Sequence, residues 1–389
     1  MTGRLQFSDG LTPERFLAEV WQRQPLLLRA ALPGFRSALS PEELAGLACE
    51  SGVEARLVLE CGTRPWEVRH GPFEESDFAG LPDTHWTLLV QDVDKLVPEV
   101  AALLDAFAFL PEWRLDDIMI SYAVDQGSVG PHTDDYDVFL VQAQGRRRWR
   151  IDPDPAEDAP CLSGLDLRIL ERFEAREQWV LEPGDILYLP PGVPHWGIAE
   201  GPCITWSVGM RAPDWQELAT AWYDRLIAAR LPRARYRDPD LRPPRHRGEI
   251  PTAVVAEVRR YLETALSGAD DGTFAAWLGA YLTEPKENLE PEPPDYPLEP
   301  PAFRRALERA GMIQRGPSRL LFTQTPGGEV LLFAAGVTYR LRAELLGLAD
   351  LVTGRRTLTQ EQLRPWLDDP VCLDLLSSLY NQGHYDLPD

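Results

Sequence analysis

The spacing of hydrophobic and polar residues changes along this chain and divides it into regions. In residues 12–50, apolar side chains recur at helical spacing behind Thr12, a residue type that caps helix N-termini. From about residue 55 to 210, short segments instead carry apolar residues at every second position and are separated by turn sequences. Helical spacing returns at 215–231 and 253–282. The pattern therefore predicts a helical extension, a barrel or sandwich of many short strands, and then a helical region.

The last part of the chain begins with a stretch dense in proline and glutamate, which predicts an extended linker. Beyond it the spacing predicts a helix, strands at 319–323 and 329–342, and further helices. We therefore expect a β domain with its helical extension, a helical region, a linker and a small C-terminal α/β domain. Their expected ranges are 1–210, 211–284, 285–301 and 302–389.

Composition narrows the classes of partner. Lysine and arginine number 39 and aspartate and glutamate number 61, so the formal net charge is −22. Such a chain repels polyanions, which argues against direct nucleic-acid contact, and attracts basic partners. No apolar run reaches the length of about 18 residues that suggests a membrane helix, and the N-terminus lacks a signal-peptide core. The five cysteines form no CxxC pair. We therefore expect a cytoplasmic protein with free thiols and no membrane contact.

Two histidines lie in sequence contexts that suit a metal site. In His132-x-Asp134, residues i and i+2 of an extended segment point to the same side, so an imidazole and a carboxylate can meet one ion. His195 ends a rigid turn after a short apolar strand, within residues 184–195. Two histidines and one carboxylate are the usual non-haem Fe(II) ligands and leave coordination positions open. Either motif alone is common as ordinary structure, but together they predict an iron site formed by all three residues.

The two motifs, HxD and GDxxYxPxxxPH, resemble those of JmjC-type cupin oxygenases, which use Fe(II), 2-oxoglutarate and O2. Further segments are similar to the bacterial ribosomal oxygenases, and the resemblance covers most of the chain. These segments are 21–26, 70–73, 113–121, 136–139, 145–150 and 207–213.

This resemblance implies an Fe(II)- and 2-oxoglutarate-dependent hydroxylase of an arginine side chain in a large-subunit ribosomal protein (number sixteen). It implies that His132, Asp134 and His195 bind the metal, with 2-oxoglutarate and O2 in the open positions. In the family a JmjC domain, which is a double-stranded β-helix, precedes a helical dimerisation region and a winged-helix-like C-terminal domain. The implied fold is α+β with a mainly β core, and the implied assembly is a homodimer that binds a basic ribosomal protein.

Alternation along one strand selects a candidate for the co-substrate carboxylate. In residues 146–151, Arg147 shares a face with Trp149 and Ile151, so it points inward. A buried arginine needs an anion, and guanidinium binds carboxylates bidentately. The alternative is a structural pair with an internal Asp or Glu. The family places its co-substrate arginine at this position, which favours the 2-oxoglutarate interpretation.

Small polar faces on two other strands supply the remaining candidates. Ser121 and Thr205 are candidate contacts to 2-oxoglutarate, although such faces also occur where a helix packs closely. The related enzymes often have Asn in place of Thr205, which is a departure from the family pattern. For a substrate guanidinium, Asp125, Tyr136 and Ser207 could supply a carboxylate, a ring and a hydroxyl.

Two other classes of function stay open at this level. One is a 2-oxoglutarate oxygenase with a different protein target, such as a histidine hydroxylase or a lysine demethylase. The other is a non-catalytic metal-cupin regulator that binds a partner through its C-terminal domain. A winged-helix-like domain also suggests nucleic-acid binding, but fold alone does not give function, and the sequence holds no concentrated basic recognition helix there.

Overall fold

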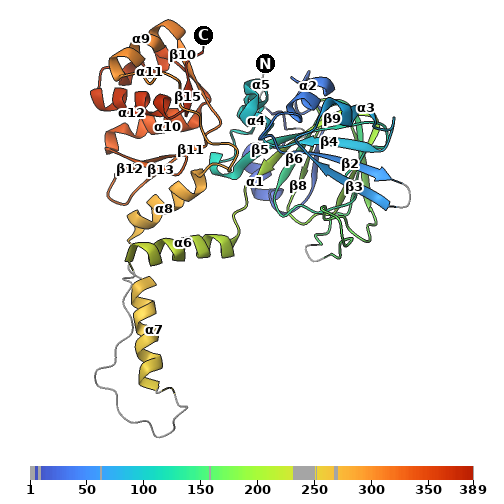
Figure 1. Cartoon of the computed structure of the whole chain (residues 1–389), viewed down its shortest axis with the longest axis horizontal. Helices are drawn as coiled ribbons and strands as arrows, with labels where there is room; N and C mark the ends of the chain where they lie inside the picture. The colour runs from blue at the N-terminus through green and yellow to red at the C-terminus, as the bar shows by residue number, and fades with distance from the viewer. Residues whose placement is uncertain are drawn as a thin grey trace.

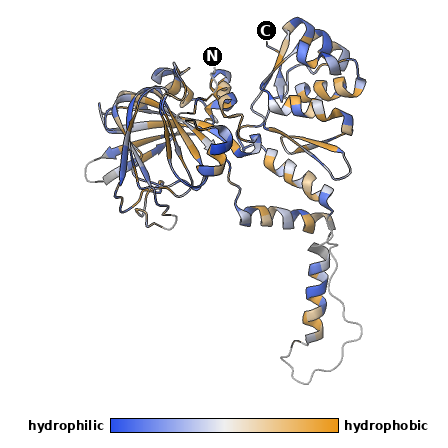
Figure 2. Cartoon of the chain, turned by 180° about the vertical axis from the view of Figure 1, so that it is seen from behind, coloured by the Kyte–Doolittle hydropathy of each residue, from blue (hydrophilic) through white to orange (hydrophobic). Residues whose placement is uncertain are grey.

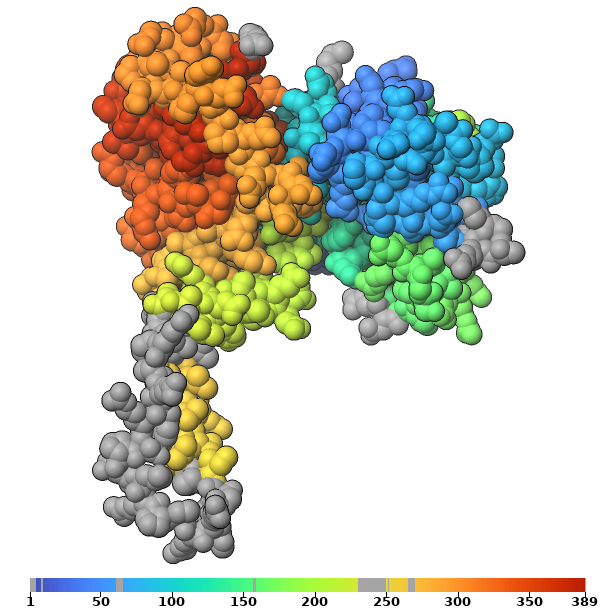
Figure 3. Space-filling view, in the orientation of Figure 1, coloured from blue at the N-terminus to red at the C-terminus, as the bar shows by residue number. Residues whose placement is uncertain are grey.

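The computed structural model describes residues 5–7, 10–61, 64–156, 159–230, 250, 252–266 and 270–388. Figure 1 shows a β domain on one side, a mixed C-terminal domain on the other, and helices α6 and α8 between them. Helix α7 extends away from both domains (Figures 1 and 3). Among the residues described, no helix combines the length and the hydrophobicity needed to cross a bilayer.

The β domain is built on one nine-stranded antiparallel sheet that curls into a barrel (Figure 1). Its strands run in the order β1-β8-β6-β9-β5-β4-β2-β3, with β7 also paired to β6. The strands are β1 (Leu26–Leu28), β2 (Ala55–Cys61), β3 (Arg64–His70), β4 (Trp86–Val90), β5 (Leu115–Ala123), β6 (Val138–Ile151), β7 (Glu177–Leu181), β8 (Ile186–Leu189) and β9 (His195–Met210). The expected mainly β core is therefore confirmed.

The long strands β6 and β9 pair along most of their length and form the backbone of the barrel. Their register shifts twice between Gln142 and Arg146, which bends the pair as bulges do. Gly145 lies in this bend with φ +64, and a Cβ there would come within 2.2 Å of the Pro202 carbonyl oxygen. Only glycine fits at this position.

Short helices surround the barrel on its outer side. They are α1 (Pro13–Glu19), α2 (Pro41–Leu47), α3 (Glu75–Ala79), α4 (Val93–Leu96), α5 (Pro98–Ala101) and the 3₁₀ turns η1 (Ala102–Phe107) and η2 (Glu112–Arg114). The Thr12 side chain caps α1, as its position predicts. Phe16 of α1 is fully buried, with its ring centroid 5.0 Å from that of Tyr188 in β8. The N-terminal helices thus cover the outward apolar face of the sheet, whose large side chains include Trp206.

Three longer helices follow the barrel: α6 (Trp215–Arg230), α7 (Thr252–Leu266) and α8 (Asp271–Thr283). The C-terminal domain then consists of α9 (Pro300–Ala310), β10 (Met312–Arg315), β11 (Leu320–Gln324), β12 (Val330–Ala334), β13 (Val337–Leu341), η3 (Ala343–Leu345), α10 (Leu346–Gly354), β14 (Thr357–Thr359), α11 (Gln360–Leu363), η4 (Arg364–Trp366), α12 (Pro370–Asn381) and β15 (Tyr385–Asp386). Its strands form two three-stranded sheets around a separate apolar core.

The strand predicted at 329–342 is wrong in one respect, because the structure divides it into β12 and β13. The chain turns at Ala335 and Gly336, which have φ values of 44° and 78°. Positive φ at both central positions is typical of a two-residue hairpin turn. Residues 330–334 are continuously apolar and all buried, so no break in a two-residue period marks the end of β12.

Candidate metal and co-substrate site

The three predicted metal-binding residues meet at one end of the barrel. His132 lies in the segment before β6, and its backbone pairs with that of His195 at the start of β9 through hydrogen bonds of 3.0 and 2.9 Å. Asp134 follows two residues later, and its carbonyl oxygen accepts a hydrogen bond from the Gly192 N–H at 2.8 Å. The turn that precedes His195 and the HxD segment therefore hold each other in place.

The side chains of this triad converge. The Nε2 atoms of His132 and His195 lie 3.8 and 3.6 Å from the two carboxylate oxygens of Asp134. One donor atom from each residue falls within 4.8 Å of the other two. Among the described residues, no other group of three or more His, Cys, Asp or Glu side chains could hold an ion.

Backbone carbonyls set the tautomer of both imidazoles. The Nδ1 of His132 lies 3.0 Å from the Gly130 carbonyl oxygen, and the Nδ1 of His195 lies 2.9 Å from that of Val193. Because a carbonyl only accepts, each Nδ1 carries the proton and each Nε2 keeps an unprotonated lone pair, so it can act as a donor atom beside the Asp134 carboxylate. Burial and the neighbouring His132 lower the pKa of His195 to about 4, so this imidazole is neutral, as a metal ligand must be.

The triad opens onto a cavity of about 320 Å³ inside the barrel. Its wall includes side chains from β2, β4, β5, β6 and β9, together with residues 167–169. Arg147, Trp149, Ser121, Tyr136 and Ser207 all line it. The strand alternation that directed Arg147 and Trp149 inward is therefore correct in the structure.

Arg147 is a buried cation that forms no ion pair with a carboxylate of the described residues. Only 6% of the residue is exposed, and its Nη1 donates to the hydroxyls of Ser121 at 3.1 Å and Thr205 at 3.4 Å. Its Nε has no hydrogen-bond partner, and no carboxylate of the described residues forms an ion pair with it. The alternative interpretation, a structural ion pair between Arg147 and an internal Asp or Glu, is therefore not found among the described residues. A buried guanidinium that has no ion pair within the protein favours binding of an anion from the cavity.

Two predicted contacts differ from expectation. Thr205 is buried behind Arg147 rather than on the cavity wall, and its hydroxyl donates to Gln142 Oε1 at 3.1 Å. Asp125 lies outside the cavity, where its Oδ1 accepts the Gly201 N–H at 2.7 Å. The alternation failed for Asp125 because β5 ends at Ala123 and the chain then turns, with positive φ at Gln126.

The structure adds a cavity residue that the sequence reasoning missed. Asp117 shares the inward face of β5 with Met119 and Ser121, and it lines the cavity. Burial, followed by the neighbouring Asp92, raises the pKa of Asp117 to about 7. Extending the alternation of β5 toward its start, rather than beyond its end, would have identified this carboxylate instead of Asp125.

Known proteins resemble the chain in both halves. A family model described as JmjC domain matches residues 102–218, and one described as ROXA-like winged helix matches residues 267–386. The ribosomal protein uL16 3-hydroxylase of Escherichia coli is 37% identical over 371 residues, which span 95% of this chain and 96% of that protein. These matches confirm the JmjC-type β core and the winged-helix C-terminal domain.

Solved structures agree along the whole length. An X-ray structure of Escherichia coli YcfD superposes with a TM-score of 0.84 at 35% identity and covers 99% of this chain and 100% of that one. Another structure, of the Escherichia coli ribosomal oxygenase YcfD in complex with cobalt and 2-oxoglutarate, superposes with a TM-score of 0.80 at 35% identity, over 98% of this chain and 99% of that one.

Proposed function

This chain belongs to the JmjC-type ribosomal oxygenases, and from that premise we propose that it is an Fe(II)- and 2-oxoglutarate-dependent hydroxylase of ribosomal protein uL16. The substrate group is an arginine side chain. The observation that carries the proposal is the placement of the His132–Asp134–His195 triad and the unpaired Arg147 in one cavity.

The donor set fits a ferrous ion. Two imidazole nitrogens and one carboxylate oxygen face a common point, and no fourth His, Cys, Asp or Glu of the described residues joins them. His132, Asp134 and His195 would therefore hold Fe(II) and leave positions free for small molecules. Fe(II) with 2-oxoglutarate and O2 supplies the oxidising chemistry that inserts a hydroxyl group into a C–H bond.

Arg147 is proposed to bind the carboxylate of 2-oxoglutarate that points away from the metal. Its buried position orients the guanidinium and limits the contact with water that would weaken the ion pair. Ser121 lines the cavity beside it and is a second contact to the co-substrate. Thr205 is proposed to position Arg147 and not to contact 2-oxoglutarate, because its hydroxyl accepts a hydrogen bond from Arg147 and does not line the cavity.

The cationic substrate side chain is proposed to enter between Asp117, Tyr136 and Ser207. All three line the cavity, and together they offer a carboxylate, an aromatic ring and a hydroxyl. Asp117 takes the role that the sequence suggested for Asp125. The net charge of −22 favours approach of a basic ribosomal protein. Because that substrate belongs to the ribosome, we place the enzyme in the cytoplasm.

The helical region is proposed to form a homodimer. Apolar side chains of α6 and α7 are exposed in a single chain, among them Trp215 at 84%, Val255 at 50% and Leu262 at 47%. Figure 2 shows hydrophobic residues along α6, α7 and α8. A second copy would remove this surface from water.

The proposed domain boundaries remain 1–210, 211–284, 285–301 and 302–389. Part of the helical region, 211–284, lies outside the described residues. The winged-helix match begins earlier than the proposed C-terminal domain, at residue 267.

The decisive test is turnover with a defined peptide. Purified protein with Fe(II), 2-oxoglutarate and a synthetic uL16 peptide should form succinate and add one oxygen atom to an arginine, read by mass spectrometry. Peptides offering histidine or methyl-lysine in place of that arginine test the other oxygenase functions. If 2-oxoglutarate is consumed with none of them, while the protein still binds a partner, the regulator interpretation replaces the proposal.

A further inference from the structure

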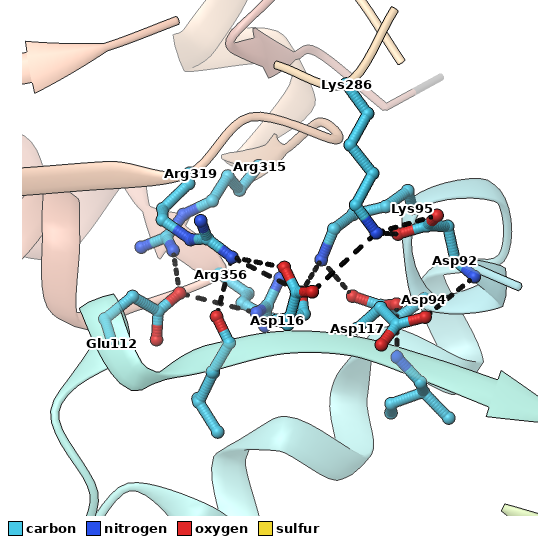
Figure 4. A network of polar contacts seen from close by, with 12 residues as sticks. Asp92, Asp94, Lys95, Glu112, Asp116, Asp117, Lys286, Arg315, Arg319 and Arg356 are labelled. Atoms are coloured by element: carbon cyan, nitrogen blue, oxygen red, sulfur yellow. Dashed lines mark hydrogen bonds and ion pairs between the residues drawn. The ribbon is translucent and has the colours of Figure 1, made fainter. Parts of the chain in front are cut away.

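A network of charged side chains joins the C-terminal half of the chain to the cavity wall (Figure 4). We propose that Lys286, in the segment between α8 and α9, is a positioning residue for Asp117, and that this C-terminal segment thereby sets the specificity of the cavity for a cationic substrate. The inference rests on the proposed function, because it assumes that Asp117 receives the substrate guanidinium.

Asp117 and its neighbours in β5 are held in place by hydrogen bonds with α4 and with Asp92, the residue that precedes this helix. Its Oδ2 accepts the backbone N–H of Asp92 at 3.2 Å. The N–H of the next residue, Ile118, donates to Asp94 Oδ1 at 2.7 Å, and the carbonyl of Asp116 accepts from Lys95 Nζ at 3.0 Å. The register of β5 against β9 shifts at this place, so these contacts replace regular sheet pairing.

Asp92 is the link between Lys286 and Asp117. Its φ of 54° places it in the left-handed region, which non-glycine residues adopt when surrounding contacts enforce it. The residue is only 7% exposed. Lys286 Nζ contacts both of its carboxylate oxygens, at 2.8 and 3.0 Å. Lys286 therefore holds Asp92 in the conformation that directs its N–H toward Asp117.

Charge balance gives Lys286 a second effect on the same carboxylate. Four carboxylates gather here, and they belong to Asp92, Asp94, Asp116 and Asp117. Lys286 is the cation that most lowers the pKa of Asp117, against burial and the neighbouring acids that raise it. Lys95 contacts Asp94, and Tyr136 faces the site from the segment before β6. Removal of Lys286 leaves Asp117 more protonated and less able to bind a guanidinium.

Other cations of the network serve a different purpose. Arg319 of the C-terminal domain pairs with Asp116 Oδ1 at 3.1 Å and donates to the Leu115 carbonyl at 2.6 Å. Asp116 does not line the cavity. Arg319 thus attaches the domain to the outer side of β5 and provides a matched control: it carries the same charge in the same network, but it contacts Asp116 and not Asp92, the residue whose N–H donates to Asp117.

The experiment compares four full-length proteins with the uL16 peptide: wild type, Lys286→Met, Lys286→Arg and Arg319→Met. Lys286→Met should raise the peptide KM about tenfold, while kcat and the KM for 2-oxoglutarate stay within about twofold. Lys286→Arg should restore the wild-type KM. Arg319→Met should lower the melting temperature and leave the peptide KM unchanged. In an Asp117→Asn background, Lys286→Met should have no further effect on peptide affinity measured by calorimetry.

The outcomes distinguish a failure of the proposed hydroxylase function from a failure of the proposed role of Lys286. Wild type that does not modify the peptide overturns the proposed function, and with it the inference. Active wild type with an unchanged peptide KM in Lys286→Met overturns the inference alone. An equal KM increase in Arg319→Met also overturns it, because the effect would then be one of domain attachment. If Lys286→Met does not fold, Lys286→Gln removes the charge and keeps a hydrogen-bond donor, with the same expected KM increase.

Discussion

The barrel cavity and the C-terminal domain each bury an arginine, and they surround it differently. Arg315 of β10 is 8% exposed, and its Nη1 donates to the Glu112 carboxylate at 2.8 Å. Its Nη2 donates to the carbonyl oxygens of Val352 at 3.1 Å and Arg355 at 2.9 Å. For Arg147, the hydrogen-bond acceptors among the described residues are two neutral hydroxyls, with no carboxylate beside them. The Nε of both residues is unpartnered, so the difference lies at the terminal nitrogens.

This difference separates a structural cation from a binding cation. Arg315 has its compensating charge within the protein, and its pair joins the C-terminal domain to η2 of the β domain. Arg147 has none among the described residues, so its charge is compensated when an anion enters the cavity. A buried arginine therefore indicates a ligand only when the fold around it provides no carboxylate.

The largest expected effect comes from the metal site. His132→Ala should reduce turnover by about 10³-fold or more, because the ion that supplies the chemistry loses a ligand. The folding of the domain should change little, since His132 lies at the rim of the barrel. Succinate formation and thermal unfolding measure the two quantities. Peptide binding that is lost together with turnover would contradict a purely metal-binding role.

Replacement of Arg315, the structural arginine, should lower the stability of the protein. Arg315→Met removes one of the two arginine partners of Glu112, the other being Arg356, and leaves buried carbonyls unsatisfied, so we expect a loss of about 3 kcal/mol in the free energy of unfolding. Urea denaturation measures it. The KM for 2-oxoglutarate should stay at the wild-type value in the folded variant. A selective change in that KM would break the distinction between the two arginines.

Replacement of Arg147, the binding arginine, should lower the affinity for 2-oxoglutarate. Arg147→Met should raise the KM for 2-oxoglutarate about 10–100-fold, because the charge-assisted bonds to its carboxylate are lost. Cobalt binding, followed by visible absorption, should be retained. Stability should be equal or higher, because a buried unpaired charge is replaced by an apolar chain of similar length. An unchanged KM would contradict the role of Arg147.

The smallest effect concerns pH. Because the pKa of Asp117 is raised to about 7, its carboxylate becomes charged as pH rises from 6 to 8, and affinity for a cationic peptide should increase by about tenfold over that range. The same shift makes ionisation unfavourable in the folded state, so its contribution to stability is lost as pH rises through about 7. Calorimetry at several pH values measures the affinity. Asp117→Asn should remove this dependence, and a dependence that persists would assign it to another group.

Local sequence patterns determined much of this protein. The two-residue period sent Arg147 and Trp149 inward, and the Thr12 cap marked the start of α1. The motifs around His132 and His195 identified the residues that converge. These features are local, because side-chain direction on a strand and cap geometry at a helix depend on a few neighbouring residues.

Tertiary structure alone decided which acidic residue faces the cavity and what surrounds each buried charge. Asp117 lies within β5, whereas Asp125 lies beyond its end at Ala123, and only the folded structure shows where the strand ends. Lys286 meets Asp92 across 194 positions of sequence. No periodicity encodes such a contact, since it depends on how the C-terminal domain packs against the barrel, and the burial that shifts the pKa of Asp117 exists only once the chain is folded.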